Sequence, residues 1–238
     1  MNAFRPTAIP LMTTDPFFSI WSFADRLTDD SPRHWTGRRQ SMLGVLTVDG
    51  VPYRFMGQTD PFESYFADGP ALKQTSVTVN PTSTVYTFAH PLCDLTVTFL
   101  TPLLCDRPEV MSRPVSYVFY KIVPVEEGHT FEMYIDASCD LCGDEKGQNF
   151  VHHVENGHAW IGAAEQNVLN ESGDDVRIGW GYLHLVHPNA EVSTRNCRTA
   201  FFRKRVSQRT KDRIARETAD ELLSFRTFPL VSATSEKL

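Results

Sequence analysis

Short runs of β-forming residues, separated by turn residues, recur along most of this 238-residue chain and constrain its fold more than any other feature. The clearest pair flanks Asp49-Gly50 within residues 42–57, because Asp-Gly between two alternating apolar runs is a strong hairpin signal. Similar runs occupy residues 75–89, 94–102, 112–125, 129–138, 150–166, 176–188 and 191–202. The runs at 75–89 and 150–166 are predicted to fold into hairpins that turn at Asn80-Pro81 and Asn156-Gly157. Strands at this spacing are typical of an antiparallel sandwich or barrel. We therefore expect a mostly β fold, an antiparallel β-sandwich.

A helical pattern occurs late in the chain. Residues 205–225 lack Gly and Pro and are rich in good helix formers, which predicts one C-terminal helix. Its large apolar residues are few, so the pattern favours a solvated helix or a linker. We divide the chain into an N-terminal segment packing on the sandwich, the sandwich itself, and a helix with linker: residues 1–60, 61–204 and 205–238.

Composition narrows the classes of partner and the cellular location. The formal net charge is −6, so no basic field favours nucleic acid. No apolar run approaches the roughly 18 residues of a membrane span. The N-terminus lacks a basic start and an apolar run, so it does not resemble a signal peptide. The five cysteines form an odd number, which favours reduced thiols in the cytoplasm. We expect a cytoplasmic protein as the sequence stands, and a secreted one if the natural N-terminus has been trimmed.

Two sequence patterns bear on metal binding. Cys139 and Cys142 form one CxxC motif, but a zinc site needs a second ligand pair and a redox motif normally opens a helix in a βαβ unit. His152 and His153 are adjacent in a predicted strand and point to opposite faces, so they cannot share one metal ion. We expect no metal and no cofactor.

The segment from Asp15 to Gly37 is the densest in chemically specialised residues. It holds two tryptophans, four aspartates, two arginines and one histidine. Aromatic side chains bury large areas and keep a polar group at their edge, whereas carboxylates beside Arg and His form ion pairs or sites with shifted pKa values. Such a segment forms the wall of a site or seats one domain on another, and we favour the second.

Within this segment, Asp29, Asp30, Arg33 and His34 have the residue types of general acid–base catalysis. Adjacent residues do not by themselves define the spacing of a catalytic carboxylate pair. The simpler interpretation is a turn in which the aspartates cap backbone N–H groups and pair with Arg33. A domain interface and a catalytic role at the rim of an active site remain as alternatives, and His34 is more typical of a hydrogen-bonded structural histidine.

Two further groups are candidates for binding or for a domain interface. Trp21 and Trp35 are more typical of core or interface residues than of sugar-stacking platforms. The second group follows the loop after residue 166 and could project from a strand end into a cleft, with a turn and a salt bridge as the simpler interpretation. It consists of Asp174, Asp175, Arg177 and Trp180.

Several motifs, in order, resemble the N-terminal region of the glutaminase A family of fungi and gut bacteria. They include DPFFSIWSFADRLTDDSPRHWTG, VDGVPYRFMG, LTVTFLTPLL and EQNVLNESGDDVRIGWGYLHL, and the resemblance extends from about Arg5 to about His187. In the last motif the resemblance implies an Asp where this chain has Gly179.

The resemblance implies a β-sandwich of the type found beside glycosidase domains, followed by a catalytic six-hairpin α/α toroid. The implied activity is hydrolysis of L-glutamine to L-glutamate and ammonia. A toroid needs about twelve helices of roughly three turns each, which the rest of this chain cannot supply. We therefore expect an N-terminal, non-catalytic region that seats a downstream catalytic domain of the same polypeptide and lends the loop 25–35 to its active-site rim.

Two other functions stay open. One is a carbohydrate-binding or carbohydrate-processing module of a glycosidase-like enzyme, which aromatic side chains on a sheet face would favour. The other is an interaction module that forms a homo-oligomer through its sheet face.

Overall fold

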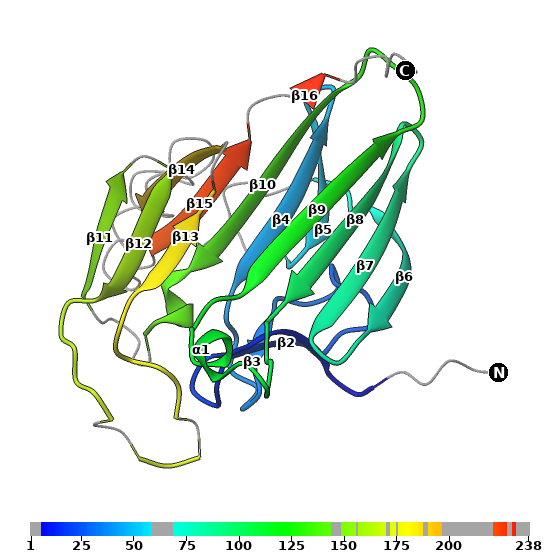
Figure 1. Ribbon diagram of the computed structural model, residues 1–238. Helices are drawn as coiled ribbons and strands as arrows, with labels where there is room; N and C mark the ends of the chain where they lie inside the picture. Colours follow the sequence, from blue (N-terminus) through cyan, green and yellow to red (C-terminus); the bar gives the residue numbers. More distant parts are fainter. Residues whose placement is uncertain are drawn as a thin grey trace, which may run out of the picture.

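The computed structural model describes residues 6–58, 69–143, 149–155, 157–169, 172–174, 176–187, 190–196, 221–227 and 230–231 (Figure 1). The largest sheet runs in the order β14-β15-β10-β4-β5, and β16 also pairs with β10. Its strands are β4 (Met42–Val48), β5 (Val51–Met56), β10 (Thr130–Ser138), β14 (Ala190–Asn196), β15 (Glu221–Thr227) and β16 (Leu230–Val231).

Three smaller sheets complete the described fold, and every ladder between their strands is antiparallel. The second sheet contains β6 (Lys73–Val79), β7 (Ser83–His90), β8 (Cys93–Leu100) and β9 (Tyr117–Pro124). The third contains β1 (Ile9–Thr13), β2 (Ser19–Ser22) and β3 (Arg33–His34). The fourth contains β11 (Phe150–Glu155), β12 (His158–Ala163) and β13 (Leu183–Val186).

Helix is scarce in the described residues. It comprises α1 (Pro108–Met111) and a 3-10 turn at Cys139–Leu141. None of the helices in these residues has the length and apolar content needed to cross a membrane. The prediction of a mostly β, antiparallel fold is therefore confirmed.

One hydrophobic cluster joins the four sheets. Alternation along β8 buries Leu95, Val97 and Phe99, and these side chains belong to the same cluster as Met133 and Ile135 of β10. The cluster also includes residues of the smaller sheets: Ile9, Leu11, Ile20, Ala159 and Ile161. Because both large sheets bury one face in this cluster, β4 and β10 form one layer of the fold and β7, β8 and β9 form the opposite layer (Figure 1).

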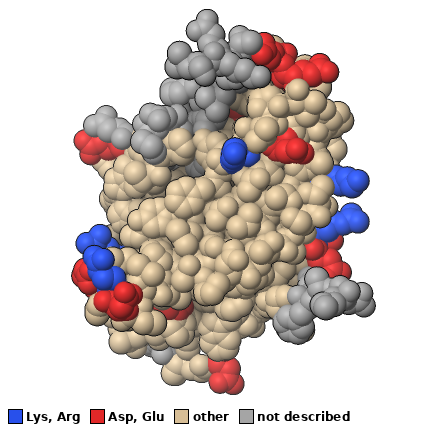
Figure 2. Space-filling view, turned by 45° about the vertical axis from the view of Figure 1, so that its right-hand side comes forward, with Lys and Arg blue, Asp and Glu red and all other residues tan. Residues whose placement is uncertain are grey.

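The outer face of the second sheet is largely uncharged. Figure 2 brings forward the side on which β6–β9 lie in Figure 1, and charged side chains gather mainly at the margins of that view. The strand register places Thr98 beside Phe119 and Leu100 beside Tyr117 on this face. Phe119 and Tyr117 are 54% and 46% exposed, and their rings lie 5.8 Å apart.

The hairpin predictions are confirmed where the structure describes the strands. β4 and β5 are joined by Asp49-Gly50, whose φ angles of 48° and 81° are those of a tight hairpin turn. The Asp49 carboxylate accepts a hydrogen bond from the Thr130 N–H at 2.8 Å, which lowers the pKa of Asp49. β6–β7 and β11–β12 form the other two predicted hairpins.

Two predictions of secondary structure are wrong in part. Strand β15 takes the place of the last residues of the helix predicted at 205–225, because Glu221–Thr227 pairs with both β10 and β14. These two backbone ladders outweigh the local helix propensity; residues 205–220 lie outside the described residues. The predicted strand at 176–188 is reduced to β13, because residues 176–182 follow an irregular path in which Gly181 has φ +77°.

The division of the chain at residues 60 and 204 stays a prediction. The largest sheet includes strands from all three proposed segments, since β4 and β5 precede residue 60 and β15 follows residue 204. The N-terminal segment and the final strands therefore share backbone hydrogen bonding with the central strands.

Because partly buried histidines lie at contacts with the sheets, we expect the stability of the protein to depend on pH. Burial lowers the pKa of His187, which stacks on Tyr120 of β9, and burial also lowers the pKa of His90 and His184. Between the ordinary histidine pKa of about 6.5 and the lower folded value, the unfolded chain binds more protons, so stability falls as the pH drops through about 6.5. His187→Phe, which keeps the ring, should flatten this dependence in urea titrations at several pH values. Parallel pH profiles for the variant and the parent would contradict the prediction.

Candidate functional site

The segment 15–37 folds into the small sheet β1-β2-β3, which packs on the main core. β2 pairs with β3 so that Ile20 lies opposite His34 and Trp21 lies opposite Arg33. Ile20 is fully buried, whereas Trp21 is half-buried and its indole N–H donates to Ser19 Oγ at 2.5 Å. The segment is thus seated through alternate residues of short strands.

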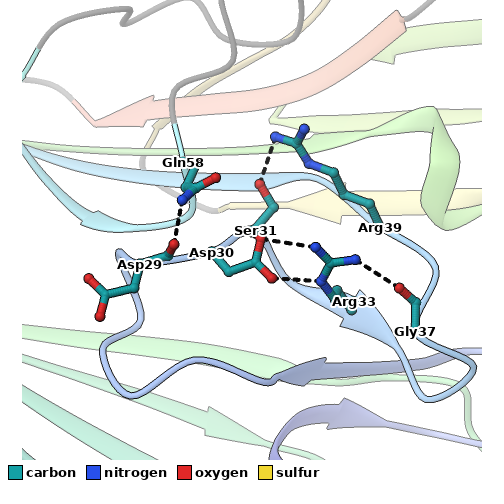
Figure 3. A network of polar contacts seen from close by, with 7 residues as sticks. All are labelled: Asp29, Asp30, Ser31, Arg33, Gly37, Arg39 and Gln58. Atoms are coloured by element: carbon teal, nitrogen blue, oxygen red, sulfur yellow. Dashed lines mark hydrogen bonds and ion pairs between the residues drawn. The ribbon is translucent and has the colours of Figure 1, made fainter.

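Asp30 and Arg33 form an ion pair at the start of β3 (Figure 3). The Arg33 Nε donates to Asp30 Oδ2 at 2.6 Å, and Asp30 Oδ1 accepts from the Ser31 N–H at 2.8 Å. Arg33 also donates to the Gly37 carbonyl at 2.9 Å. The hydrogen bond that Arg33 donates to the Asp30 carboxylate raises the pKa of Arg33. This ion pair belongs to the simpler interpretation, although Asp30 lies in a bend and Arg33 in strand β3, and the Asp30 carboxylate makes only local contacts.

Asp29 does not share these contacts. Its side chain is exposed and points away from the Asp30–Arg33 pair, while its backbone carbonyl accepts a hydrogen bond from the Gln58 side chain (Figure 3). The two adjacent aspartates therefore face different surroundings.

His34 is fully buried and hydrogen-bonded at both ring nitrogens. Nε2 lies 3.1 Å from the Pro16 carbonyl oxygen, which can only accept, so Nε2 carries the proton. Nδ1 then accepts from the Thr36 N–H at 3.4 Å and lies 3.0 Å from Thr36 Oγ1. A ring held in this way orients the chain around Pro16 and offers solvent no free base.

Trp35 is the exposed aromatic residue of the segment. Its indole N–H donates to the same Pro16 carbonyl at 2.7 Å, and 51% of the residue is exposed. The ring is thus fixed at one edge and open on its surface. A fixed aromatic side chain of this kind is typical of interface residues.

The fold brings residues 176–180, which include part of the second group of candidates, into contact with the segment 15–37. The Ile178 N–H donates to the Phe17 carbonyl at 3.0 Å, and the Phe17 and Trp180 rings meet edge to face at 5.2 Å. Arg177 is buried and donates to the Gly143 carbonyl at 3.3 Å. Asp174 is exposed, and Asp175 lies outside the described residues. Sequence reasoning missed Phe17, because nothing local shows that Trp180 will pack on it.

The loop between β12 and β13 is closed at its base by Gln166. Its amide accepts from the Gly181 N–H at 2.5 Å and donates to the Gly181 carbonyl at 3.3 Å. Beyond this base, Val168 and Leu169 are 61% and 65% exposed, and Leu169 has φ +53°. The loop therefore presents two apolar side chains to solvent from a closed base.

Long-range contacts hold the loop that carries Asp25–Asp30. Arg54 of β5 donates to the Thr28 carbonyl at 2.6 Å and also to the Gly57 carbonyl. Gln74 of β6 accepts from the Leu27 N–H at 2.8 Å. Burial lowers the pKa of Arg54 against the opposing effect of Asp29. No local signal in the sequence pairs Arg54 or Gln74 with this loop.

A row of aromatic and imidazole rings covers the outer face of β11-β12-β13. The ring row consists of His153, Trp160, Tyr182, His184 and His158, whose neighbouring centroids lie between 4.7 and 6.4 Å apart. Tyr182 lies over Gly162, where a Cβ would approach the ring to 2.4 Å. The opposite face of this sheet packs into the core through Ala159, Ile161, Leu183 and Leu185.

The cysteines of the CxxC motif are buried structural thiols. Cys142 Sγ lies 3.4 Å from the Cys139 carbonyl oxygen, and burial raises the pKa of Cys142 to about 12. Such a thiol is a poor nucleophile and a poor metal ligand near neutral pH. Within the ranges that the structure describes, no group of three or more His, Cys, Asp and Glu side chains is arranged to hold a metal ion.

Comparison with known proteins places the chain in a family. It belongs to the family described as "Domain of unknown function (DUF5127)", which matches residues 82–231, and residues 1–63 match "Domain of unknown function (DUF4964)". The chain is 26% identical over 189 residues to glutaminase A of Aspergillus oryzae, covering 74% of this chain and 26% of that protein. It is 24% identical over 245 residues to a probable glutaminase of Arthroderma benhamiae, covering 91% of this chain and 28% of that protein.

The predicted resemblance to the N-terminal region of glutaminase A is thereby confirmed. The chain spans about a quarter of the length of these curated relatives. No solved structure matches the chain.

Proposed function

We propose that this chain is the non-catalytic N-terminal β-region of a glutaminase-type amidohydrolase that converts L-glutamine to L-glutamate and ammonia. Its similarity to two glutaminases, along about a quarter of their length, is the observation that carries this proposal. In this role the chain seats the catalytic region of the same polypeptide.

The seating surface is the loop end, which we define by the exposed apolar residues Phe23, Trp35, Leu104, Met111, Val168 and Leu169. These residues belong to or adjoin β2, β3, α1 and the β12–β13 loop, which lie toward one end of the molecule in Figure 1. Exposed apolar side chains on hydrogen-bonded loops are typical of surfaces that pack against a second domain.

The contacts of the acid–base candidates support a structural role. Asp30 is paired with Arg33, and both nitrogens of the buried His34 are hydrogen-bonded. Neither side chain offers a general base to a substrate without first breaking these contacts. In this proposal the loop 25–35 contributes the indole of Trp35 to the rim of the catalytic region.

The test compares variants in the complete product of the native gene. An antibody against this chain first establishes the mass of that product, and ammonia release from L-glutamine is then measured. We expect this chain alone to be inactive and Trp35→Ala in the complete product to lower kcat/KM by about tenfold or more, the loss of one interface hot spot. The matched control is Phe119→Ala, which removes an equally exposed ring from the outer face of β9.

Three outcomes would contradict the proposal. The first is ammonia release by this chain alone, and the second is a native product no larger than this chain. The third is that the Trp35→Ala and Phe119→Ala variants have equal activity and equal thermal stability. That result would mean that the loop end is not the seating surface.

A carbohydrate-binding module is the second candidate, and the ring row is the observation that favours it. Aromatic faces such as Tyr182, which is 46% exposed, can stack on sugar rings. Affinity electrophoresis of this chain in soluble polysaccharides separates the two functions. Retardation that Tyr182→Ala abolishes would favour the module, whereas a seating region should migrate unchanged.

A further inference from the structure

Two histidines of the ring row meet through their ring nitrogens. Nε2 of His158 on β12 lies 2.8 Å from Nδ1 of His184 on β13, and the ring planes differ by 14°. A neutral imidazole has one nitrogen that donates and one that accepts, so a single proton joins this pair. Both nitrogens that meet here are the type of ligand that transition metals bind.

We propose that His158 and His184 form a two-histidine site for a divalent transition-metal ion, with Cu²⁺ preferred over Ni²⁺ and Zn²⁺. On binding, the shared proton moves through solvent to the other nitrogen of the ring that carried it, and the ion then binds one nitrogen of each neutral ring. Water molecules complete its coordination on the solvent side. The site is separate from the loop end and does not depend on the proposed glutaminase role.

The Irving–Williams order favours Cu²⁺ at this pair, because imidazole nitrogens bind Cu²⁺ more tightly than Ni²⁺ or Zn²⁺. Two metal–nitrogen bonds of about 2.0–2.1 Å at a right angle separate the nitrogens by about 2.9 Å, close to the observed distance. Tetrahedral Zn²⁺ requires about 3.4 Å and hence a wider opening of the pair. In either case the rings must turn so that both lone pairs converge, and the exposed His184 can do so at the surface.

The surroundings keep the pair accessible and available. One carboxylate on this face belongs to Glu155, which lies opposite His158 in the strand register and 3.5 Å from His153 Nε2. It adds negative charge that favours a cation without occupying the nitrogens of the pair.

The test titrates Cu²⁺, Ni²⁺ and Zn²⁺ into the untagged chain by calorimetry at pH 7.4. We expect one saturable Cu²⁺ site per chain, and His158→Ala or His184→Ala should weaken binding at least about tenfold, which is about 1.4 kcal/mol. The electron paramagnetic resonance spectrum of the Cu²⁺ form should show two imidazole nitrogens in the parent and at most one in either variant.

The matched control is His153→Ala, which removes an exposed imidazole from the same ring row. It should leave the Cu²⁺ affinity within about twofold of the parent value, a difference of less than 0.5 kcal/mol. Trp160 lies opposite His184 in the register, so Cu²⁺ should quench a component of the fluorescence that Trp160→Phe removes. The proposal is overturned by the absence of saturable binding or by equal losses in His153→Ala and His184→Ala.

Discussion

Replacing Phe55 by alanine is expected to lower the free energy of unfolding by about 3–5 kcal/mol, the range for truncating a buried phenylalanine. Phe55 of β5 is fully buried, and its ring lies 5.9 Å from that of Phe88 across the core. It therefore links the two layers of the fold. Thermal unfolding should show a large fall in Tm, since about 1 kcal/mol corresponds to about 2–4 °C in a chain of this size.

The same ring explains why β4 carries a glycine. A Cβ at Gly44 would lie 2.3 Å from Phe55 Cζ, well inside van der Waals contact. Gly44→Ala should therefore cost about 1–3 kcal/mol by overpacking. Combining Gly44→Ala with Phe55→Leu relieves the clash. The double variant should therefore lose less stability than the sum of the losses in the two single variants.

Urea denaturation of the four proteins in this cycle measures the coupling. Val51→Ala, on the exposed part of the same hairpin, is the control and should change stability by less than about 0.5 kcal/mol. Additive effects of Gly44→Ala and Phe55→Leu would show that the two positions do not compete for one space.

Arg54→Met is expected to destabilise the protein by about 2–3 kcal/mol, because two backbone carbonyls lose a charged hydrogen-bond donor. Arg54 donates to the carbonyls of Thr28 and Gly57, and methionine retains only the apolar part of the side chain. The loss should be concentrated in the loop that leads to Asp30.

Hydrogen exchange can locate this effect. The amides of Leu27 and Gly57, which are bonded to Gln74 Oε1 and to the Leu27 carbonyl, should exchange faster in Arg54→Met. Amides of β8 should keep their protection against exchange when the variant and the parent are compared at the same interval below their own unfolding midpoints. Arg26→Met, at an exposed position of the same loop, is the control. Equal exchange at Leu27 in both variants would contradict a specific role for Arg54.

Local chemistry made the hairpins predictable. Asp49-Gly50 adopts positive φ at both residues, which few other residue pairs accept, and the turn then sets the pairing of β4 with β5. The ion pair of Asp30 with Arg33 is also local, since the two residues are three apart in the sequence. Such contacts join residues that are close along the chain, so they could be predicted from the sequence.

Contacts between distant segments were not foreseeable in this way. The helix expected over 205–225 was wrong over residues 221–225, because strand β15 (Glu221–Thr227) joins β10 and β14 from far along the chain. The pairing of Phe17 with Trp180 and the support of Thr28 by Arg54 likewise join residues far apart in sequence. A propensity averaged over neighbouring residues contains no information on such partners.

The sequence by itself determined that this chain is mostly β, that its hairpins turn at Asp49-Gly50 and near Gly157, and that it resembles a glutaminase N-terminal region. Alternation and turn residues act within a few positions, so they are visible along the chain. The tertiary structure alone decided which strands share a sheet and how His34 and Trp35 meet at the Pro16 carbonyl. The pairing of distant strands depends on which arrangement buries the most apolar surface while satisfying the backbone donors and acceptors. This balance involves residues far apart in the sequence, so it becomes visible only in the folded chain.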